Sequence, residues 1–295
     1  MQNGPVRYDA DRLASLCFDP LLYNIRTNLA CSFDLDPDTN LTDLFSDDCE
    51  YFIEDQFNDM LSSEDSRICD SFSLLHLNIR SLQCNASKLT DLLSNVSLKF
   101  SLIGISETWL NDSSSSVDID GYCFVHKSRE NRSGGGVGLY VSSNLNFKFR
   151  CDLDFSLPNV AESLFIEIVK PEGKNIVTGA IYRPPNQNVD EFLTMTNELL
   201  SKISNENKVC YLIGDFNLNL MNDQCHSVTG EFLDALYSNM FFPLITRPTR
   251  ITCHSATGCN SFNLTVNAPL HNVSAVVSPR DPFWAPCFSC SILMI

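Results

Sequence analysis

The sequence predicts an α/β fold, and three observations support this prediction. Short apolar segments rich in β-branched and aromatic residues, such as 209–213, are typical of buried strands. Amphipathic segments such as 189–203 lie between them and repeat their apolar residues at helical spacing. A strand, a helix and a second strand follow one another over 72–105, and this order favours a parallel pair of strands.

The charge of the 295-residue chain is concentrated at its N-terminal end. Residues 1–70 contain 16 acidic and 4 basic residues, whereas residues 71–295 carry a net charge of only −4. A segment this acidic, with few periodic apolar positions, cannot bury a core of its own. We therefore predict a largely disordered leader at 1–70, with a short helix near 9–16, and a domain at 71–295 whose C-terminal end is divergent or truncated.

The sequence favours an intracellular protein. Its 13 cysteines are odd in number and irregularly spaced, and no apolar secretory segment follows Met1. No apolar run reaches the roughly 18 residues that a membrane span requires. We expect reduced thiols, no secretion and no membrane partner.

Local patterns predict the remaining elements of the domain. Strands are expected at 72–77, 100–105, 164–169, 175–181, 209–213 and 273–277, together with one that ends at Val141. Helices are expected at 88–96, 189–203 and 230–240. The last thirteen residues show no regular pattern and are expected to form an irregular, hydrophobic tail.

The run Gly134-Gly135-Gly136 is superficially similar to a phosphate-binding loop. Such a loop follows a strand and opens a helix, whereas these glycines precede an expected strand. The position excludes a nucleotide-binding loop and favours a turn.

Polar side chains stand at or just past the end of four expected strands. They are Asn78, Glu107, Tyr182, and Asp215 with Asn217. A single Asp or Asn at a strand end would predict only a turn, but four such ends favour a shared site. Carboxylates and amides gathered in this way suit an oxygen-preferring cation such as Mg²⁺, and hence phosphate chemistry.

Five segments carry a more specific signal. They are NIRS (78–81), SETWL (106–110), IYRPP (181–185), GDFN (214–217) and TRPTRIT (246–252). These motifs resemble those of the endonuclease/exonuclease/phosphatase superfamily, in particular the endonuclease domain of LINE-type (non-LTR) retrotransposons, and the resemblance covers about residues 72–280. It implies a four-layer α/β sandwich, in which two mixed β-sheets pack face to face with helices outside.

The resemblance also implies a role for each polar residue. Glu107 and Asn78 match residues that hold Mg²⁺ or Mn²⁺, and Asp215 matches the residue that orients or deprotonates the attacking water. Asn217 matches an amide that binds a phosphate oxygen, and Tyr182 matches a tyrosine that supports the scissile phosphate or the leaving group. Together they would cut a phosphodiester by in-line attack of water.

The C-terminal motifs depart from the family pattern. Where the family has Ser-Asp-His, this chain has Arg280-Asp281-Pro282, so Asp281 matches the aspartate and a proline replaces the histidine. Asn260 is the nearest match to a further family aspartate. Proline cannot transfer a proton, so two functions stay open. One is a Mg²⁺-dependent, DNA-nicking endonuclease of a mobile element, and the other is a catalytically impaired remnant that at most binds nucleic acid or a protein. Phosphatases of the superfamily are disfavoured by the retroelement-like IYRPP and TRPTRIT segments.

Contacts with DNA would depend on a few arginines, because residues 71–295 show no basic stripe. The expected contacts are Arg183, Arg247 and Arg250, with Arg129 and Arg132 as further candidates, and binding is expected to be weak and salt-sensitive. The resemblance further implies a monomer that acts in the nucleus if it cuts genomic DNA. Its expected partner is a reverse transcriptase region encoded downstream in a complete element.

Overall fold

The computed structural model describes residues 49–63, 72–111, 114, 117–129, 134–185, 187–218, 227–244, 261–266, 273–278 and 290–294. These residues belong to one compact unit, Cys49–Ile295. The helix expected near 9–16 lies outside them. No helix among the described residues is long and apolar enough to cross a membrane.

Within these ranges one sheet contains seven strands, in the order β1-β12-β13-β2-β3-β5-β4. The strands are β1 (Cys49–Ile53), β2 (Ser73–Asn78), β3 (Leu102–Ser106), β4 (Tyr122–Lys127), β5 (Val137–Ser142), β12 (Val273–Ser278) and β13 (Cys290–Met294). β2 and β3 pair in parallel, as the strand–helix–strand order predicts. β5 is antiparallel to both of its neighbours, so the sheet is mixed.

The second sheet has six strands among the described residues, in the order β10-β11-β9-β8-β7-β6. They are β6 (Asn146–Phe149), β7 (Glu162–Val169), β8 (Ile176–Tyr182), β9 (Val209–Asp215), β10 (Phe241–Pro243) and β11 (Ser261–Val266). β8 and β9 form a parallel pair, whereas β7 and β8 are antiparallel. This sheet is therefore also mixed.

The two sheets pack against each other through one apolar core. β2, β3 and β5 contribute residues such as Leu74, Leu102 and Leu139, and the facing strands contribute Ile166 and Ile213. Neighbouring positions along the same strands point away from this core, because side chains alternate across a strand. The strands β2, β3 and β5 are thus buried on both faces, which explains their nearly continuous apolar sequences.

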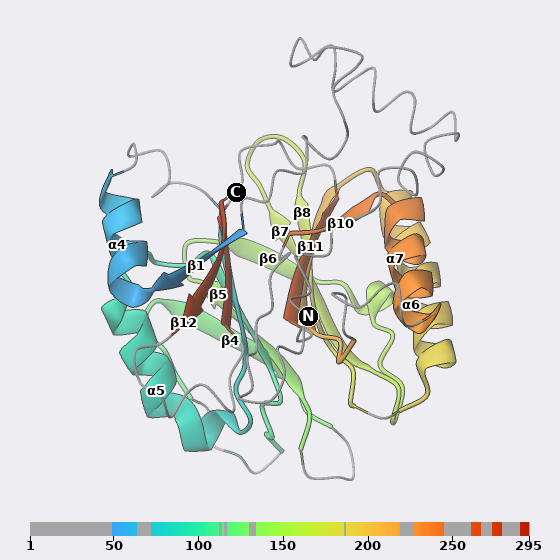
Figure 1. The fold of residues 1–295 in the computed structure, drawn as a ribbon, viewed down its shortest axis with the longest axis horizontal. Coiled ribbons are helices and arrows are strands. Elements are labelled where there is room, and N and C mark those ends of the chain that lie inside the picture. Colours follow the sequence, from blue (N-terminus) through green and yellow to red (C-terminus); the bar gives the residue numbers. More distant parts are fainter. Residues whose placement is uncertain are drawn as a thin grey trace, which may run out of the picture. The chain divides into compact units, whose positions relative to one another are not determined.

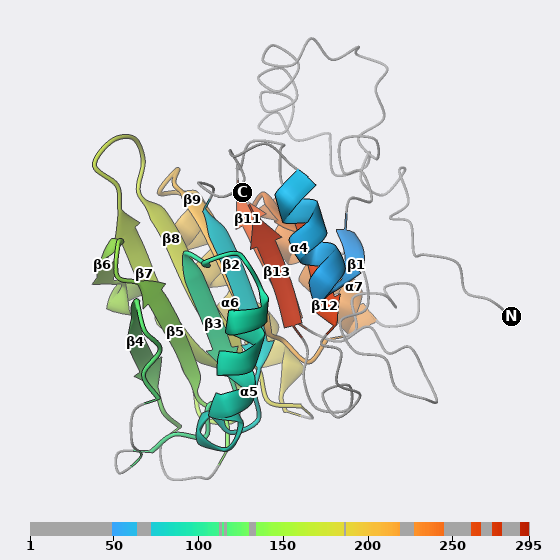
Figure 2. The ribbon, with the colours of Figure 1, turned by 90° about the vertical axis from the view of Figure 1, so that its left-hand side faces the viewer.

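Helices cover the outer face of each sheet (Figures 1 and 2). α4 (Glu54–Ser63) and α5 (Leu82–Asn95) pack on the seven-stranded sheet, while α6 (Val189–Ser204) and α7 (Ser227–Ser238) lie on the six-stranded sheet. On the latter side, Phe192 of α6 stacks on Phe232 of α7 with ring centroids 6.0 Å apart. A short 3₁₀ helix, η1 (Cys151–Leu153), follows β6. The expected four-layer α/β sandwich, with two packed mixed sheets flanked by helices, is confirmed.

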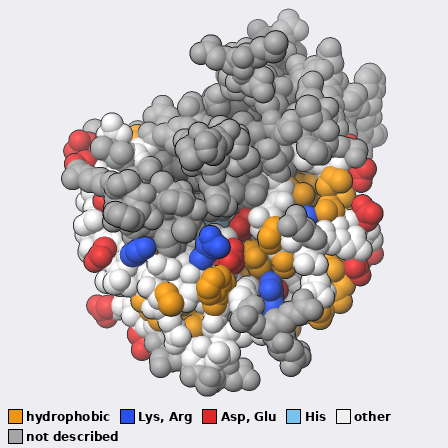
Figure 3. Space-filling view, turned by 60° about the horizontal axis from the view of Figure 1, so that its bottom comes forward, with side chains coloured by type: hydrophobic (Ala, Val, Ile, Leu, Met, Phe, Trp, Pro, Cys, Tyr) orange, Lys and Arg blue, Asp and Glu red, His pale blue; other side chains and the backbone are white. Residues whose placement is uncertain are grey.

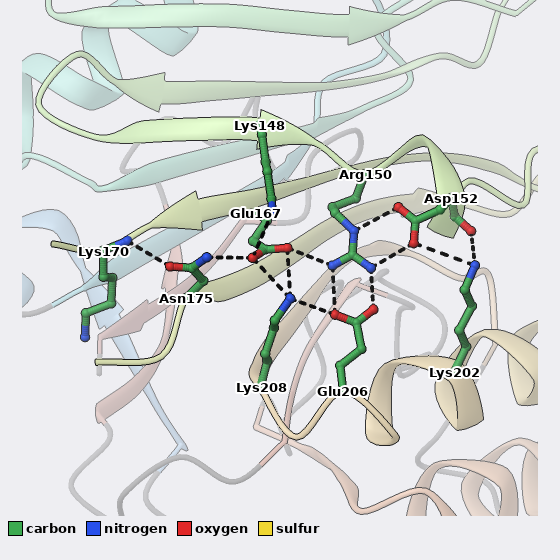
Figure 4. Close-up of polar contacts among 9 residues, drawn as sticks. All are labelled: Lys148, Arg150, Asp152, Glu167, Lys170, Asn175, Lys202, Glu206 and Lys208. Carbon is green, nitrogen blue, oxygen red and sulfur yellow. Dashed lines mark hydrogen bonds and ion pairs between the residues drawn. The ribbon is translucent and has the colours of Figure 1, made fainter. Parts of the chain in front are cut away.

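An ion-pair network surrounds Glu167 of β7 on the helix-covered side of the six-stranded sheet (Figure 4). The buried Glu167 of β7 accepts hydrogen bonds from Arg150 at 2.9 Å, from Lys208 at 3.1 Å and from Asn175 at 2.7 Å. Burial alone would raise the pKa of Glu167. The three hydrogen bonds outweigh burial and lower the pKa to about 2.

Two terminal segments differ from the sequence-based expectation. The domain was expected to begin at residue 71, yet β1 and α4 already belong to the compact unit that begins at Cys49. α4 buries Phe57 and Leu61, which are four positions apart and therefore lie on one face of the helix. Charged residues surround these two positions in the sequence, so the apolar pattern of the helix is hard to recognise there. The last thirteen residues were expected to be irregular, but 290–294 form β13, antiparallel to β2.

Candidate active site

The site lies where two parallel strand pairs, one in each sheet, reach their carboxyl ends. Asn78 ends β2 opposite Ser106 of β3, and Tyr182 ends β8 opposite Asp215 of β9. The position before Asp215 must be glycine, because β8 lies so close that a Cβ atom at Gly214 would collide with the carbonyl oxygen of Ile181. Pairing in register therefore fixes which polar residues stand side by side.

Asn78 joins the two sheets through its side-chain amide. Its Nδ2 donates hydrogen bonds to Glu107 Oε1 and to Asp215 Oδ2, each at 2.7 Å. Because both acceptors are carboxylates, the amide nitrogen must face them, and the orientation of the amide is therefore determined. Asn78 Oδ1 is left buried without a hydrogen-bond partner among the described residues.

The backbone at the site is strained. Of the eight non-glycine residues with positive φ in the described ranges, five stand just past β2, β3 or β9. They are Arg80 (φ 44°), Ser81 (φ 83°), Glu107 (φ 55°), Trp109 (φ 54°) and Asn217 (φ 47°). Hydrogen bonds hold these segments together, among them Ser81 N to Glu107 O at 2.9 Å. Such conformations cost of the order of 1–3 kcal/mol each and cluster at functional sites.

Asn217 and Asp215 are held in a fixed relation after β9. The backbone N–H of Asn217 donates to Asp215 Oδ1 at 3.1 Å, and Asn217 Nδ2 donates to the carbonyl oxygen of Arg183 at 2.7 Å. The hydrogen bond to Arg183 uses one of the two N–H groups of the Asn217 side-chain amide. The other is the group that could meet a phosphate oxygen.

The expectation that Arg183 contacts DNA is wrong. Only 3% of this residue is exposed, and its guanidinium lies over the ring of Phe192, 5.7 Å from the centroid. Its Nη1 atom donates to the carbonyl oxygens of Pro184, just past β8, and of Phe216, just past β9, each at 3.4 Å. Burial lowers the pKa of Arg183. The residue supports the turns after β8 and β9 from inside.

Tyr182 is buried beside both carboxylates. Burial, followed by the charges of Glu107 and Asp215, raises the pKa of Tyr182 above its ordinary value. Its hydroxyl therefore stays protonated and can donate. The guanidinium of Arg129 lies 5.8 Å from the centre of the tyrosine ring and is paired with Glu162 of β7, which stands opposite Tyr182 in register.

Glu162 was not expected at the site, and Arg129 was expected only as a contact to DNA. Strand pairing was the signal for Glu162 in the sequence. The strands expected at 164–169 and 175–181 were expected to pair, and an antiparallel pair places a residue near the start of the first strand beside Tyr182 at the end of the second.

His76, two positions before Asn78, is fully buried, and burial lowers its pKa to about 3. It is therefore neutral.

The donors present fit a magnesium ion. Across the described residues no group of three or more His, Cys, Asp or Glu side chains could hold a metal by itself. Mg²⁺, however, commonly takes one or two carboxylates from the protein and completes its shell with water and phosphate oxygens. The carboxylate of Glu107 and the partnerless Oδ1 of Asn78 are oxygen donors of this kind.

The remaining predicted residues lie outside the described residues; they are Asp281, Arg132, Arg247 and Arg250, together with Asn260 and Pro282. On the described part of the face shown in Figure 3, Lys and Arg side chains are few and stand apart among acidic and hydrophobic side chains. The described part of this face thus has no continuous basic area.

Solved structures of similar fold are known. The endonuclease domain of TRAS1, a telomere-specific non-LTR retrotransposon, superimposes with a TM-score of 0.56 at 13% identity, covering 76% of this chain and 98% of that one. The AP endonuclease LMAP from Leishmania major gives 0.59 at 15% identity, with 79% and 89% covered. TDP2 from D. rerio, complexed with a single-strand DNA product, gives 0.53 at 12% identity, with 76% and 98% covered. No curated protein matches the sequence significantly.

A sequence comparison assigns the family. The model of the Endonuclease/Exonuclease/phosphatase family matches residues 75–270, which is more than half of the chain and includes Asn78, Glu107, Tyr182, Asp215 and Asn217. The chain belongs to the endonuclease/exonuclease/phosphatase family.

Proposed function

We propose that this protein is a Mg²⁺-dependent endonuclease that nicks DNA by hydrolysing a phosphodiester bond. The observation that carries the proposal is the cluster of Asn78, Glu107 and Asp215, in which one amide holds two carboxylates from different sheets at 2.7 Å. Membership of a family of nucleases and phosphatases supports a phosphodiesterase-type hydrolase. Mn²⁺ suits the same oxygen donors.

Glu107 and Asn78 are the residues that would hold the metal. When bound, Mg²⁺ neutralises the charge that develops on the phosphate oxygens. Asn78 also keeps the two carboxylates in place, because it occupies an acceptor oxygen of each. The backbone that carries this carboxylate is strained, because Glu107 has a φ of 55°.

Asp215 is the proposed general base. One of its oxygens accepts from Asn78 and the other from the backbone N–H of Asn217, so the carboxylate cannot rotate freely. A carboxylate fixed in this way can orient a water molecule and take its proton as the water attacks phosphorus. Tyr182, which stays protonated, and the second N–H of Asn217 would donate hydrogen bonds to the phosphate oxygens.

DNA is the proposed substrate. One structural neighbour is an endonuclease domain of a retrotransposon, and another is complexed with single-strand DNA product. By analogy, the chain would come from a mobile element, act in the nucleus as a monomer, and work beside a reverse transcriptase. Binding would be weak, because the described face has few basic side chains. It would be salt-sensitive, because the contacts to phosphate are electrostatic.

A catalytically impaired protein is the second candidate, and Pro282 is the observation that favours it. It stands where the resemblance predicts a histidine that acts on the scissile phosphate. Loss of one such group commonly lowers a rate by about 10²–10⁴-fold while substrate binding persists. The two candidates therefore differ in rate and agree on the binding site.

The test is conversion of supercoiled plasmid to the open circle by the full chain, with Mg²⁺ or with EDTA. We expect nicking that EDTA and Asp215→Ala both abolish. Asp91→Ala, which removes an exposed carboxylate from α5, is the matched control and should keep the activity. Absence of nicking together with retained DNA binding would select the impaired candidate. A 3′-phosphorylated oligonucleotide that loses phosphate while the plasmid stays intact would instead show a phosphatase.

A further inference from the structure

Trp109 is an exposed aromatic residue beside the candidate site. Its side chain lies two positions after Glu107, and 42% of the residue is exposed, whereas its neighbours Thr108 and Leu110 are buried. Its φ of 54° is unfavourable for a bulky residue. The exposure is thus a feature of this one side chain and not of a segment that lies loosely on the surface.

The backbone below Trp109 is fixed by the glycine turn that precedes β5. Trp109 N donates to the carbonyl oxygen of Gly135 at 2.8 Å, and Thr108 N donates to that of Gly136 at 3.3 Å. The three glycines of the turn have φ values of 88°, 71° and 86°, which glycine tolerates and other residues rarely adopt. A Cβ atom at Gly136 would collide with Thr108, so the turn must be glycine for this approach.

The glycine turn also leaves the indole uncovered. A Cβ atom added at Gly134 would lie 3.7 Å from the indole Nε1, so a larger side chain here would extend beside the ring. Gly135 makes room for the guanidinium of Arg129, which in turn lies over Tyr182. The GGG motif, which is no nucleotide loop, therefore leaves the indole exposed two positions after Glu107.

Trp109 lies close to Glu107 along the chain. Consecutive Cα atoms are 3.8 Å apart, so Trp109 and Glu107 are separated by at most about 7.6 Å along the backbone. A phosphate held at Glu107 would carry its sugar and base outward by a comparable length. A flat apolar ring at that position offers a stacking surface to an unpaired base of any identity, because every base has a π face.

We propose that Trp109 is a binding residue that stacks on an unpaired nucleobase next to the scissile phosphate. This inference rests on the proposed function, because the phosphate at Glu107 determines which base reaches the indole. The protein would then prefer sites at which a base has left the duplex, such as single-stranded or locally melted DNA. The preference would be for structure and not for sequence.

Intrinsic fluorescence provides the test, because the chain has only two tryptophans, Trp109 and Trp284. In a Trp284→Phe and Asp215→Asn background, which keeps the metal-holding Glu107 but lacks the proposed general base, a single-stranded oligonucleotide titrated with Mg²⁺ should quench the emission of Trp109. The same backbone with abasic sites in place of bases should leave it unquenched. Equal quenching by both would overturn the proposal, since a base would not be the group that contacts the indole.

Variants give an independent measurement of the same contact. Trp109→Ala should raise the Kd for the oligonucleotide roughly 5- to 150-fold, the range that loss of one base–aromatic stack produces, while Trp109→Phe should retain most of the affinity. Phe149→Ala is the matched control, because Phe149 is also an exposed aromatic residue (55%) but lies in β6, outside the site. An unchanged Kd for Trp109→Ala would contradict the proposal.

The outcomes separate this inference from the proposed function. If the protein fails to nick plasmid but its Kd still depends on Trp109, the stacking contact stands and the endonuclease does not. If the protein nicks but neither the fluorescence nor the Kd depends on Trp109, the endonuclease stands and the stacking contact does not. The fluorescence titration keeps Trp109 itself, so it remains decisive even if Trp109→Ala does not fold.

Discussion

Asp215, at the end of a strand in one sheet, accepts a hydrogen bond at 2.7 Å from Asn78, at the end of a strand in the other. The two residues are 137 positions apart in the sequence. This hydrogen bond links the two sheets at the point where the candidate catalytic residues lie. The geometry of the site therefore depends on how the two sheets pack.

Tyr182→Phe tests the role of the buried hydroxyl. The ring remains in place beside Arg129, so folding should be unaffected, but one donor to the phosphate is lost. We expect the nicking rate to fall by about 10²-fold, with little change in KM. Because the pKa of Tyr182 is raised, the wild-type rate should not drop from deprotonation of this residue below about pH 10. An equal rate for Tyr182→Phe would exclude it from catalysis.

Glu167→Gln tests the ion-pair network of β7. The folded-state pKa of Glu167 is depressed to about 2 from an ordinary value of 4.5, so its contribution to stability is present above about pH 4.5. That contribution is lost as the pH falls toward 2. Urea unfolding at several pH values should show a smaller decline in the free energy of unfolding over this window for the variant. An identical decline would mean that Glu167 is not stabilised by Arg150 and Lys208.

Deletions test where the domain begins. Removing residues 1–48, which contain nine acidic and three basic residues, should leave the fold intact and strengthen DNA binding by reducing repulsion. Removing residues 1–70 also takes β1 and α4, with the buried Phe57 and Leu61. Burial of each such side chain contributes about 1.5–3 kcal/mol, so this longer deletion should unfold at a clearly lower temperature in circular dichroism. Equal melting temperatures would place α4 outside the stable domain.

The C-terminal motif predicts a gain of function. The double substitution Arg280→Ser and Pro282→His rebuilds Ser-Asp-His around Asp281. If the unaltered chain lacks only this histidine, the nicking rate should rise by about 10²–10⁴-fold. Pro282→Ala, which removes the proline without supplying an imidazole, is the control. A fully active unaltered chain would show that another residue already fills this role.

Much of the site could be predicted from the sequence because its residues follow buried strands. Apolar runs identify β2, β3, β8 and β9, and the next polar residue falls at the strand end by necessity. The direction in which a long side chain points depends on contacts with distant elements, so it is not apparent from the neighbouring sequence. Arg183 follows β8 directly, yet its guanidinium packs inward over Phe192 of α6 and donates to the carbonyl oxygen of Phe216 after β9.

The less predictable elements depend on long-range pairing. Residues 290–294 have the composition of an apolar tail and become β13 because β2 and β12 offer partners on its two sides. β1 pairs in parallel with β12, more than 200 positions later, and α4 follows it directly. The glycine turn at 134–136 is similar in sequence to other glycine loops, and its role is apparent only once Thr108 and Arg129 are seen to contact it.

The most direct test of the site is the single-turnover nicking rate of Asp215→Asn with Mg²⁺. The substitution keeps the shape of the side chain and an acceptor oxygen for Asn78, but it removes the carboxylate that takes a proton from water. We expect a rate at least about 10²-fold below that of the wild-type protein, with unchanged DNA affinity. Nicking by Asp215→Asn at the wild-type rate would contradict the assignment of the cluster around Asn78 as the hydrolytic site.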